Sequence, residues 1–352
     1  MEITVLIVDD SAFMRVTLAK MLSNDPDIKV IGTARNGLDA LKQIEKLQPD
    51  VVTMDIEMPE LDGIATLKRL MATAARPVIM LSSHTSEGAE LTMEALQCGA
   101  VDFLTKPVAQ HIEETTESLI AKVKAAVTAV PKTIDVSPHN TRLSHPRKPS
   151  SAPRGVAQMV AIGTSTGGPQ ALSVVLPQLP KFIPCPILIV QHMPPRFTQA
   201  LASRLDATCD IHVVEAENNQ VLENGTAYIA PGDFHMQVRR DGREYHIELN
   251  QAAKRHEHRP SVDVLFESLA VIPDIPRHLV LMTGMGSDGT AGMQKAKESG
   301  AITIAESQET CVVFGMPKAA IARGCVDYVL PLHQIGQKLV DVTDNANLPR
   351  VD

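Results

Sequence analysis

Ile3-Thr-Val-Leu-Ile-Val-Asp-Asp10 contains an apolar run, Thr4–Val8, that ends in two carboxylates. Four further short runs follow within the first 128 residues: Lys29–Thr33, Val51–Asp55, Pro77–Leu81 and Val101–Leu104. All but the second of the five runs are nearly continuous in apolar residues, as strands covered on both faces are. Amphipathic helix candidates lie between them, among them Leu38–Leu47 and Ile64–Ala72. The pattern predicts an α/β fold in which five β–α units form a doubly wound parallel sheet.

Polar side chains follow four of these predicted strands: Asp9 and Asp10, then Asp55, Ser82 and Lys106. Ligands of such sheets bind at the carboxyl ends of the strands. Three carboxylates in one crevice repel one another unless a cation neutralises them, and hard oxygen ligands suit Mg²⁺. One of the three could then accept a phosphoryl group as a nucleophile. The simpler interpretation, solvated loop acids, explains any one Asp but not the whole set.

These residues resemble the receiver domain of two-component response regulators, a flavodoxin-like fold. The resemblance implies that Asp55 is phosphorylated by a histidine kinase, and that three acids hold the Mg²⁺ this requires: Asp9, Asp10 and Asp55. It also implies that Ser82 and Lys106 contact the phosphoryl group and that Phe103 is an aromatic switch residue. A phosphoryl group adds about −1.5 to −2 charge. That charge can bias a two-state loop arrangement near the fourth and fifth strands.

The amino-acid composition between residues 131 and 154 differs from that of the segments on either side. This stretch holds five Pro, four Ser, five basic residues and one acidic residue, a net charge of +4. Such a segment cannot bury enough surface to offset its chain entropy. We therefore predict a receiver domain at 1–128, a flexible basic linker at 129–156 and a second domain at 157–346. The basic charge of the linker serves either solubility or docking on an acidic surface.

The second domain begins with an apolar run, Met159–Ile162, that leads into Gly163-Thr-Ser-Thr-Gly-Gly-Pro169 and the helix candidate Gln170–Leu176. This is strand, glycine-rich turn and helix, with the G-x-S-x-G spacing of a nucleophile elbow. Flanking glycines allow a sharp turn that exposes the hydroxyl of Ser165, and N–H groups at the helix start can hold an oxyanion. Taken alone, the motif fits a phosphate-binding turn or a plain helix cap equally well.

Two later strand ends supply partners for such a serine. His192 follows the strand Pro186–Val190, and Asp288 follows the strand Leu279–Thr283, ahead of the helix candidate Thr290–Glu298. His192 is then a candidate base and Asp288 the acid that fixes its tautomer. The alternation again predicts a doubly wound, mostly parallel sheet. The chain order Ser, His, Asp differs from that of the α/β-hydrolases, which argues against that particular fold.

Other motifs admit different chemistry. Gly284-x-Gly286-x-x-Gly289, with Glu306 further on, satisfies a dinucleotide fingerprint and makes a regulated NAD-dependent enzyme the rival function. Rossmann domains carry that fingerprint in their first β–α unit, where this domain has the serine motif. His256-Glu257-His258 has metal-ligand residue types but no third ligand nearby, so we favour a solvated loop over a zinc site. His235 is a further, unassigned imidazole.

Five strings carry a family resemblance: Ile162-Gly-Thr-Ser-Thr-Gly-Gly-Pro169, Gln191-His-Met-Pro-Pro195, Ala230-Pro-Gly232, Arg259-Pro-Ser-Val-Asp263 and Thr283-Gly-Met-Gly-Ser-Asp-Gly289. Each is modest alone, but five in order after a receiver-like domain are highly specific. The sequence resembles the chemotaxis protein-glutamate methylesterases, which are also protein-glutamine glutaminases. The two domains together cover all but the linker and a short tail.

The resemblance implies a set of site residues: Ser165 as nucleophile, His192 as base, Asp288 as orienting acid, and Thr166 and Met285 near the oxyanion. The implied substrates are glutamate γ-methyl esters on the cytoplasmic helices of chemoreceptors, hydrolysed with release of methanol during adaptation. Certain receptor glutamines are deamidated. Ester hydrolysis needs no cofactor, so Mg²⁺ belongs to the receiver alone. In this family the unphosphorylated receiver covers the esterase site, and phosphorylation relieves that block.

Composition restricts the partners. The formal net charge is −8, and the sequence has no Trp, seven Phe and three Tyr, which argues against binding nucleic acid. No stretch reaches the roughly 18 apolar residues of a membrane helix, so no membrane insertion is expected. Five scattered Cys fit reduced thiols in a cytoplasmic protein. A receiver fused to a non-enzymatic binding domain is the alternative class, although the presence of Ser165, His192 and Asp288 together argues against it.

Overall fold

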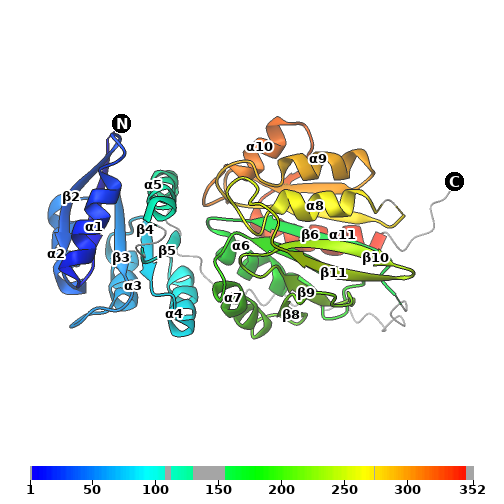
Figure 1. The fold of residues 1–352 in the computed structure, drawn as a ribbon, viewed down its shortest axis with the longest axis horizontal. Helices are drawn as coiled ribbons and strands as arrows, with labels where there is room; N and C mark the ends of the chain where they lie inside the picture. Colours follow the sequence, from blue (N-terminus) through cyan, green and yellow to red (C-terminus); the bar gives the residue numbers. More distant parts are fainter. Residues whose placement is uncertain (1, 108–111, 130–154, 273, 346–352) are drawn as a thin grey trace. The chain divides into compact units, whose positions relative to one another are not determined.

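The computed structural model describes residues 2–107, 112–129, 155–272 and 274–345. The chain divides into two units, Met1–Ile134 and Asp135–Asp352, and each is described by itself (Figure 1). The linker predicted at 129–156 falls almost entirely on residues outside the described ranges, so the predicted domain boundaries stay a prediction. No helix among the described residues is long and apolar enough to cross a membrane.

The first unit is built on a five-stranded parallel sheet in the order β2-β1-β3-β4-β5. Its strands are β1 (Ile3–Val8), β2 (Ile28–Ala34), β3 (Val51–Asp55), β4 (Val78–Ser82) and β5 (Asp102–Thr105). This is the flavodoxin-like order, so the prediction of a doubly wound parallel sheet is confirmed. Because Val8 of β1 pairs with Met54 of β3, the residues that follow, Asp9 and Asp55, lie on adjacent strands.

Local sequence explains where the helices of this unit begin. They are α1 (Ala12–Leu22), α2 (Gly37–Leu47), α3 (Gly63–Thr73), α4 (Ser86–Gln97) and α5 (Ile112–Thr128). Each of the first four follows a residue whose side chain accepts a hydrogen bond from a backbone N–H of the first turn: Ser11, Asn36, Asp62 and Thr85. Such caps satisfy donors that have no partner within the helix. The residues of β3 and β4 are all buried.

The second unit contains a seven-stranded sheet in the order β14-β13-β12-β6-β7-β9-β8. Its strands are β6 (Met159–Thr164), β7 (Ile187–Gln191), β8 (His212–Glu215), β9 (Thr226–Ile229), β12 (Arg277–Leu281), β13 (Ile302–Glu306) and β14 (Tyr328–Leu330). Every pair of neighbours in this sheet is parallel. An antiparallel hairpin is separate from it, β10 (His235–Asp241) and β11 (Glu244–Asn250). The mostly parallel α/β prediction is therefore confirmed.

Helices cover this sheet in two groups. They are α6 (Gly168–Val175), α7 (Phe197–Asp206), α8 (Val262–Ala270), α9 (Thr290–Glu298), α10 (Met316–Ala322) and α11 (Leu332–Asn345). Helices α8 and α9 pack side by side, and the β10–β11 hairpin packs on α8, whereas α6 packs on α11 (Figure 1).

The strand order turns at β6, which lies between β7 on one side and β12 on the other. In open α/β sheets such a reversal leaves a crevice at the carboxyl ends of the strands, where ligands bind. Thr164 at the end of β6 pairs with Gln191 of β7, and Gly163 pairs with Leu281 of β12. The loops after these three strands therefore meet at one place in the fold.

One strand prediction needs correction. The sequence predicts a strand at Leu279–Thr283, whereas β12 spans Arg277–Leu281. Arg277 and His278 are polar, yet only 2% and 1% of their surfaces are exposed. The guanidinium of Arg277 donates to the carbonyl oxygens of Leu269 and Ser299, so the charge is buried with partners. An apolar pattern cannot reveal a strand that begins with such residues.

The buried imidazole of His278 predicts a pH dependence of stability. Burial lowers the pKa of His278 from 6.5 to about 4, so between these values the unfolded chain binds a proton that the folded chain excludes. Stability is then complete above pH 6.5 and falls as the pH drops towards 4. We expect His278→Asn to lose this dependence, so that wild type loses up to about 3 kcal/mol more than the variant between pH 7 and pH 4. Urea unfolding followed by circular dichroism measures the difference, and a difference independent of pH would contradict the assignment.

Candidate active site and acidic cluster

Ser165 lies in the tight turn between β6 and α6. Gly167 adopts φ 79°, and a Cβ atom at that position would come within 2.5 Å of the Cβ of Val312. Both facts require glycine. The N–H of Gly168 donates to the carbonyl of Ser165 at 2.8 Å, and the N–H of Ser165 donates to the carbonyl of Thr283 at 3.0 Å. The turn therefore holds a half-buried serine at the point where β6 meets the loop after β12.

Gln191, the last residue of β7, connects the backbones of Ser165 and His192. Its buried amide nitrogen Nε2 is 2.9 Å from the carbonyl oxygen of Ser165 and 3.2 Å from that of His192. Its Oε1 accepts from the hydroxyl of Thr164 at 2.5 Å. Gln191 is a residue of this site whose role is not predicted from the sequence. The available signal was an amide that ends a buried strand immediately before the candidate base.

His192 and Asp288 form a buried pair. His192 Nε2 lies 2.8 Å from Asp288 Oδ2, and the two side chains are 5% and 2% exposed. The carboxylate accepts four further hydrogen bonds, from the hydroxyl of Ser261 and from the N–H groups of Val262, Asp263 and Gly289, at 2.7–3.0 Å. Burial alone would raise the pKa of Asp288, but His192 and these donors hold it far below its usual range. The acid is therefore ionised, at the N-terminus of α8.

This pairing decides which nitrogen of His192 can act as a base. An ionised Asp288 accepts from Nε2–H, which leaves the lone pair on Nδ1. Nδ1 is buried and has no hydrogen-bond partner among the described residues. Ser165 and His192 directly follow the paired residues Thr164 and Gln191 on neighbouring strands. The structure thus brings the serine turn, the imidazole and the acid to one end of the sheet, as the sequence predicted for strand-end residues.

Thr166 and Met285 lie on the two turns that meet at Ser165. A Cβ atom at Gly284 would be only 2.7 Å from the Cβ of Ser165, so the backbone there runs against the serine. Met285 follows Gly284 and is 40% exposed, whereas Thr166 is buried. The N–H after a nucleophile and one from a neighbouring loop are the usual donors of an oxyanion hole. The assignment of these two residues to an oxyanion stays a prediction.

The structure argues against Gly284-x-Gly286-x-x-Gly289 as a dinucleotide-binding motif. Gly284, against Ser165, and Gly289, whose N–H donates to Asp288, both belong to the serine site. Glu306, the acid that would contact a ribose, has no exposed surface, and its Oε2 accepts from the N–H of Thr283 at 2.9 Å. Gly284 and Gly289 of this motif therefore belong to the site around Ser165.

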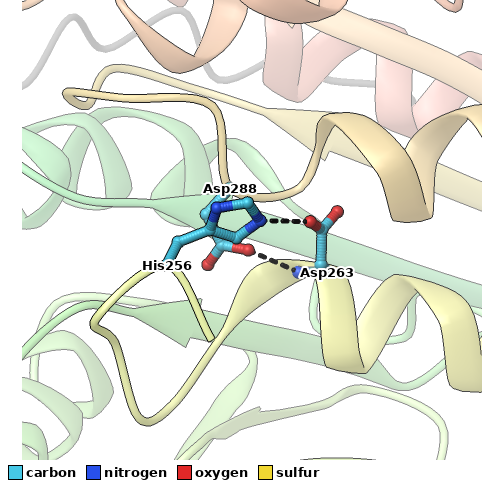
Figure 2. Close-up of side chains that lie close together, drawn as sticks. All are labelled: His256, Asp263 and Asp288. Carbon is cyan, nitrogen blue, oxygen red and sulfur yellow. Dashed lines mark hydrogen bonds and ion pairs between the residues drawn. The ribbon is translucent and has the colours of Figure 1, made fainter. Parts of the chain in front are cut away.

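His256-Glu257-His258 lies in an exposed turn, as predicted, but the expectation that no third ligand residue lies nearby is wrong. His256 Nε2 lies 2.9 Å from Asp263 Oδ2, and the N–H of Asp263 donates to Asp288 (Figure 2). The ring of His258 stacks on that of His192, with 3.9 Å between centroids and 18° between planes. Sequence reasoning missed these contacts because the partners are not neighbours in the chain.

The cluster in Figure 2 consists of three residues whose ligand atoms lie within 4.8 Å of one another: His256, Asp263 and Asp288. Its oxygens are already engaged, since Asp263 Oδ1 accepts from the N–H of Gly292 at 2.6 Å and its Oδ2 from His256. Both oxygens of Asp288 accept as well. We therefore interpret the cluster as a hydrogen-bonded network. His235, the other unassigned imidazole, is buried and bonds the carbonyl of Ala253 at 3.1 Å.

In the first unit the three predicted metal ligands come together: ligand atoms of Asp9, Asp10 and Asp55 lie within 4.8 Å of one another. Lys106 Nζ is 2.6 Å from Asp55 Oδ2 and 3.5 Å from Asp9 Oδ2. Burial raises the pKa of Asp55 to about 6 despite Lys106, and burial also raises that of Asp9. Asp9 Oδ2 is buried and has no hydrogen-bond partner among the described residues. Hard oxygen ligands and the excess negative charge of three carboxylates beside one lysine fit Mg²⁺.

The remaining predicted receiver residues are buried. Ser82 has no exposed surface, and its hydroxyl accepts from Thr92 at 2.8 Å and lies 3.0 Å from the carbonyl oxygen of Gly88, both on α4. Phe103 is 5% exposed. Asp10, the exposed acid, lines a cavity of about 590 Å³ together with Glu57 and other residues. In this conformation Ser82 is bonded to α4, and its predicted phosphoryl contact stays a prediction.

Comparison with known proteins finds relatives for both units. A family model described as CheB methylesterase matches residues 160–339, and one described as response regulator receiver domain matches residues 5–117. The protein-glutamate methylesterase/protein-glutamine glutaminase of Halalkalibacterium halodurans is 48% identical over 343 residues, covering 96% of this chain and 98% of that protein. The protein of the same name from Geobacillus kaustophilus is 50% identical over 347 residues, covering 97% and 98%. The crystal structure of the Thermotoga maritima CheB methylesterase catalytic domain matches with a TM-score of 0.51 and 46% identity, covering 52% of this chain and 97% of that one.

The acidic cluster predicts competition between protons and Mg²⁺. Because burial raises the pKa of Asp55 to about 6, the affinity for Mg²⁺ should fall as the pH drops below 6 and level off above 7. Lys106 lowers this pKa, so Lys106→Met should raise it further. Calorimetric titration measures the affinity, and carbon NMR of labelled aspartate measures the carboxyl titration. An Asp55 carboxyl that titrates near 4 in both proteins would contradict the role given to burial.

Proposed function

The chain belongs to the CheB methylesterase family and carries a response regulator receiver domain ahead of the methylesterase domain, and on that premise we propose that it is a phosphorylation-activated protein-glutamate methylesterase and protein-glutamine glutaminase. Its substrates are glutamate γ-methyl esters and certain glutamines of chemoreceptors. The observation that carries the proposal is the buried His192–Asp288 pair, 2.8 Å apart, at the strand end next to the Ser165 turn.

Acylation uses the lone pair on His192 Nδ1. Ser165 Oγ attacks the ester carbonyl carbon while Nδ1 takes the hydroxyl proton, and the carbonyl oxygen becomes an oxyanion. The N–H groups of Thr166 and Met285 are the proposed donors to that oxygen. Asp288 stabilises the positive charge that His192 acquires, because it stays ionised. The intermediate collapses, His192 returns the proton to the leaving oxygen, and methanol departs.

Deacylation repeats these steps with water. His192 takes a proton from the water that attacks the acyl-enzyme, and then returns a proton to Ser165 Oγ as the glutamate carboxylate leaves. With a glutamine substrate the same acyl-enzyme forms and ammonia leaves in place of methanol. Proton transfer by a positioned imidazole contributes about 10²–10⁴-fold to such a rate. The steps use only groups of the chain and water.

Regulation enters through Asp55. Asp9, Asp10 and Asp55 would hold Mg²⁺, and the bound ion would neutralise negative charge around the Asp55 carboxylate, which accepts the phosphoryl group from a histidine kinase. Lys106, now paired with Asp55 at 2.6 Å, offers a cation to that group. A phosphoryl group would compete with α4 for the hydroxyl of Ser82, so phosphorylation favours a second arrangement of β4 and α4. We propose that this switch, with Phe103, raises the esterase rate, and that the protein works in the cytoplasm.

The alternative class, a receiver fused to a non-enzymatic binding domain, explains less of the site. His192 Nε2 is bonded to the buried, ionised Asp288, and His192 Nδ1 has no partner among the described residues. This arrangement suits proton transfer, and a binding function does not explain it. Methanol release from methylated receptors separates the two classes, since a binding protein releases none.

We expect Ser165→Ala to abolish methanol release, by about 10⁴-fold or more, because the acyl-enzyme cannot form. Gas chromatography of methanol from methylated receptor membranes measures the rate. Ser173→Ala is the matched control and should retain the wild-type rate. It removes a hydroxyl from α6 whose one hydrogen bond among the described residues is to the carbonyl of Pro169, at 2.8 Å. Turnover by a folded Ser165→Ala protein would rule out this nucleophile.

We expect Asp55→Asn to abolish activation while the unstimulated esterase rate is retained, because an amide cannot form the acyl phosphate. The ratio of methanol release with and without acetyl phosphate and Mg²⁺ should fall to unity. Asp27→Asn is the control, since Asp27 pairs with Lys124 on the surface of the same unit. Activation that persists in Asp55→Asn would place the regulatory site elsewhere.

A further inference from the structure

We infer that His258 is a positioning residue for the reaction, because its imidazole stacks on His192 and fixes the plane of the catalytic ring. The centroids are 3.9 Å apart and the planes differ by 18°. The inference rests on the proposed function, since it assigns a role in proton transfer by His192. His258 itself exchanges no proton with the substrate in this proposal.

One hydrogen bond does not fix an imidazole. The contact with Asp288 holds the Nε2 edge of His192, and the ring can still tilt about that contact. The partner ring restricts this tilt, because parallel rings in contact lose packing energy when one of them rotates. The His192 side chain is only 5% exposed. The stack therefore restrains the orientation of Nδ1, the nitrogen that must reach Ser165.

A strained turn presents His258 to the catalytic ring. The N–H of Arg255 donates to the carbonyl of His258 at 3.1 Å, and the N–H of His258 donates to the carbonyl of Arg255 at 2.9 Å. The two residues between them, His256 and Glu257, have φ values of 50° and 61°. Two-residue turns with positive φ at both positions favour Asn-Gly, and other residues there carry strain that persists only where the surroundings impose it. Such strain concentrates at functional sites.

Three side-chain contacts to carboxylates impose this conformation, and they hold the turn on both sides of His258. The guanidinium of Arg255 bonds both carboxylate oxygens of Glu267, at 2.5 and 2.9 Å. The guanidinium of Arg259 bonds Asp233 at 2.6 and 3.0 Å. His256 bonds Asp263 at 2.9 Å, the residue whose N–H supports Asp288 (Figure 2). The turn at residues 255–259 therefore contacts both members of the catalytic pair. His258 stacks on His192, and His256 bonds Asp263, whose N–H donates to Asp288.

The test compares two substitutions at position 258. His258→Leu removes the flat ring, whereas His258→Phe keeps a flat ring that cannot titrate or bond. A misplacement of about 1 Å at a reacting group can cost about 10²-fold. We expect His258→Leu to lower kcat by about 10–100-fold with KM within about twofold, and His258→Phe to restore kcat to within about threefold of wild type. Glu257→Asn is the matched control in the same turn, because it alters an exposed side chain and keeps a residue that tolerates positive φ.

Two measurements separate this inference from the proposed function. Methanol release gives kcat and KM, and the rate at which phenylmethylsulfonyl fluoride modifies Ser165 reports activation of the serine without any receptor. Slow modification in His258→Leu and recovery in His258→Phe support the positioning role. Wild-type kcat in His258→Leu, or equal losses in the Leu and Phe variants, overturns it. A wild-type protein that releases no methanol overturns the proposed function instead.

Folding is checked by circular dichroism and thermal unfolding before any rate is compared. If His258→Leu does not fold, His258→Asn replaces it, because its polar side chain suits a half-exposed position and still lacks a ring. The criterion is unchanged: kcat must fall without the ring and recover with the ring of phenylalanine.

Discussion

The arrangement around Ser165 and His192 in the second unit depends on where the carboxylate of Asp288 lies. It occupies the N-terminus of α8, where four N–H and O–H donors and His192 surround it at 2.7–3.0 Å. Burial of a charge is costly unless it is hydrogen bonded, and here the donors and the imidazole more than offset that cost, since the pKa of Asp288 lies far below its usual range. The acid consequently fixes three things together: the start of α8, the loop after β12 and the tautomer of His192.

The two units use parallel sheets for opposite electrostatic purposes. In the second, backbone donors keep one buried acid ionised. In the first, burial raises the pKa of Asp55 to about 6, and Lys106 offsets this only in part. The negative charge of the acidic cluster is therefore incompletely neutralised, which suits binding of a cation and reaction with a phosphoryl donor. Both oxygens of Asp288 already have hydrogen-bond donors, which suits a fixed electrostatic role. Both sites lie at the carboxyl ends of strands, where the topology leaves room for ligands.

Sequence alone predicted the layout well and the contacts poorly. β3 and α9 lie at the residues predicted for them, Val51–Asp55 and Thr290–Glu298, because apolar runs and helix ends are local signals. The strand-end residues Ser165, His192 and Asp288 were identifiable for the same reason. The stacking of His258 on His192 joins residues 66 positions apart, and the bridging amide of Gln191 depends on strand register. Neither can be read from spacing, and the turn at His256-Glu257 lacks the Asn-Gly signal that usually marks its conformation.

The source of the donors around Asp288 has a consequence for sequence divergence. Three of the four besides His192 are main-chain N–H groups, those of Val262, Asp263 and Gly289, and only Ser261 contributes a side chain. Every residue except proline carries a main-chain N–H. The electrostatic setting of the acid is thus encoded mainly in the path of the backbone. The ionisation of Asp288 therefore depends on where the backbone at positions 262, 263 and 289 runs more than on the side chains that those positions carry.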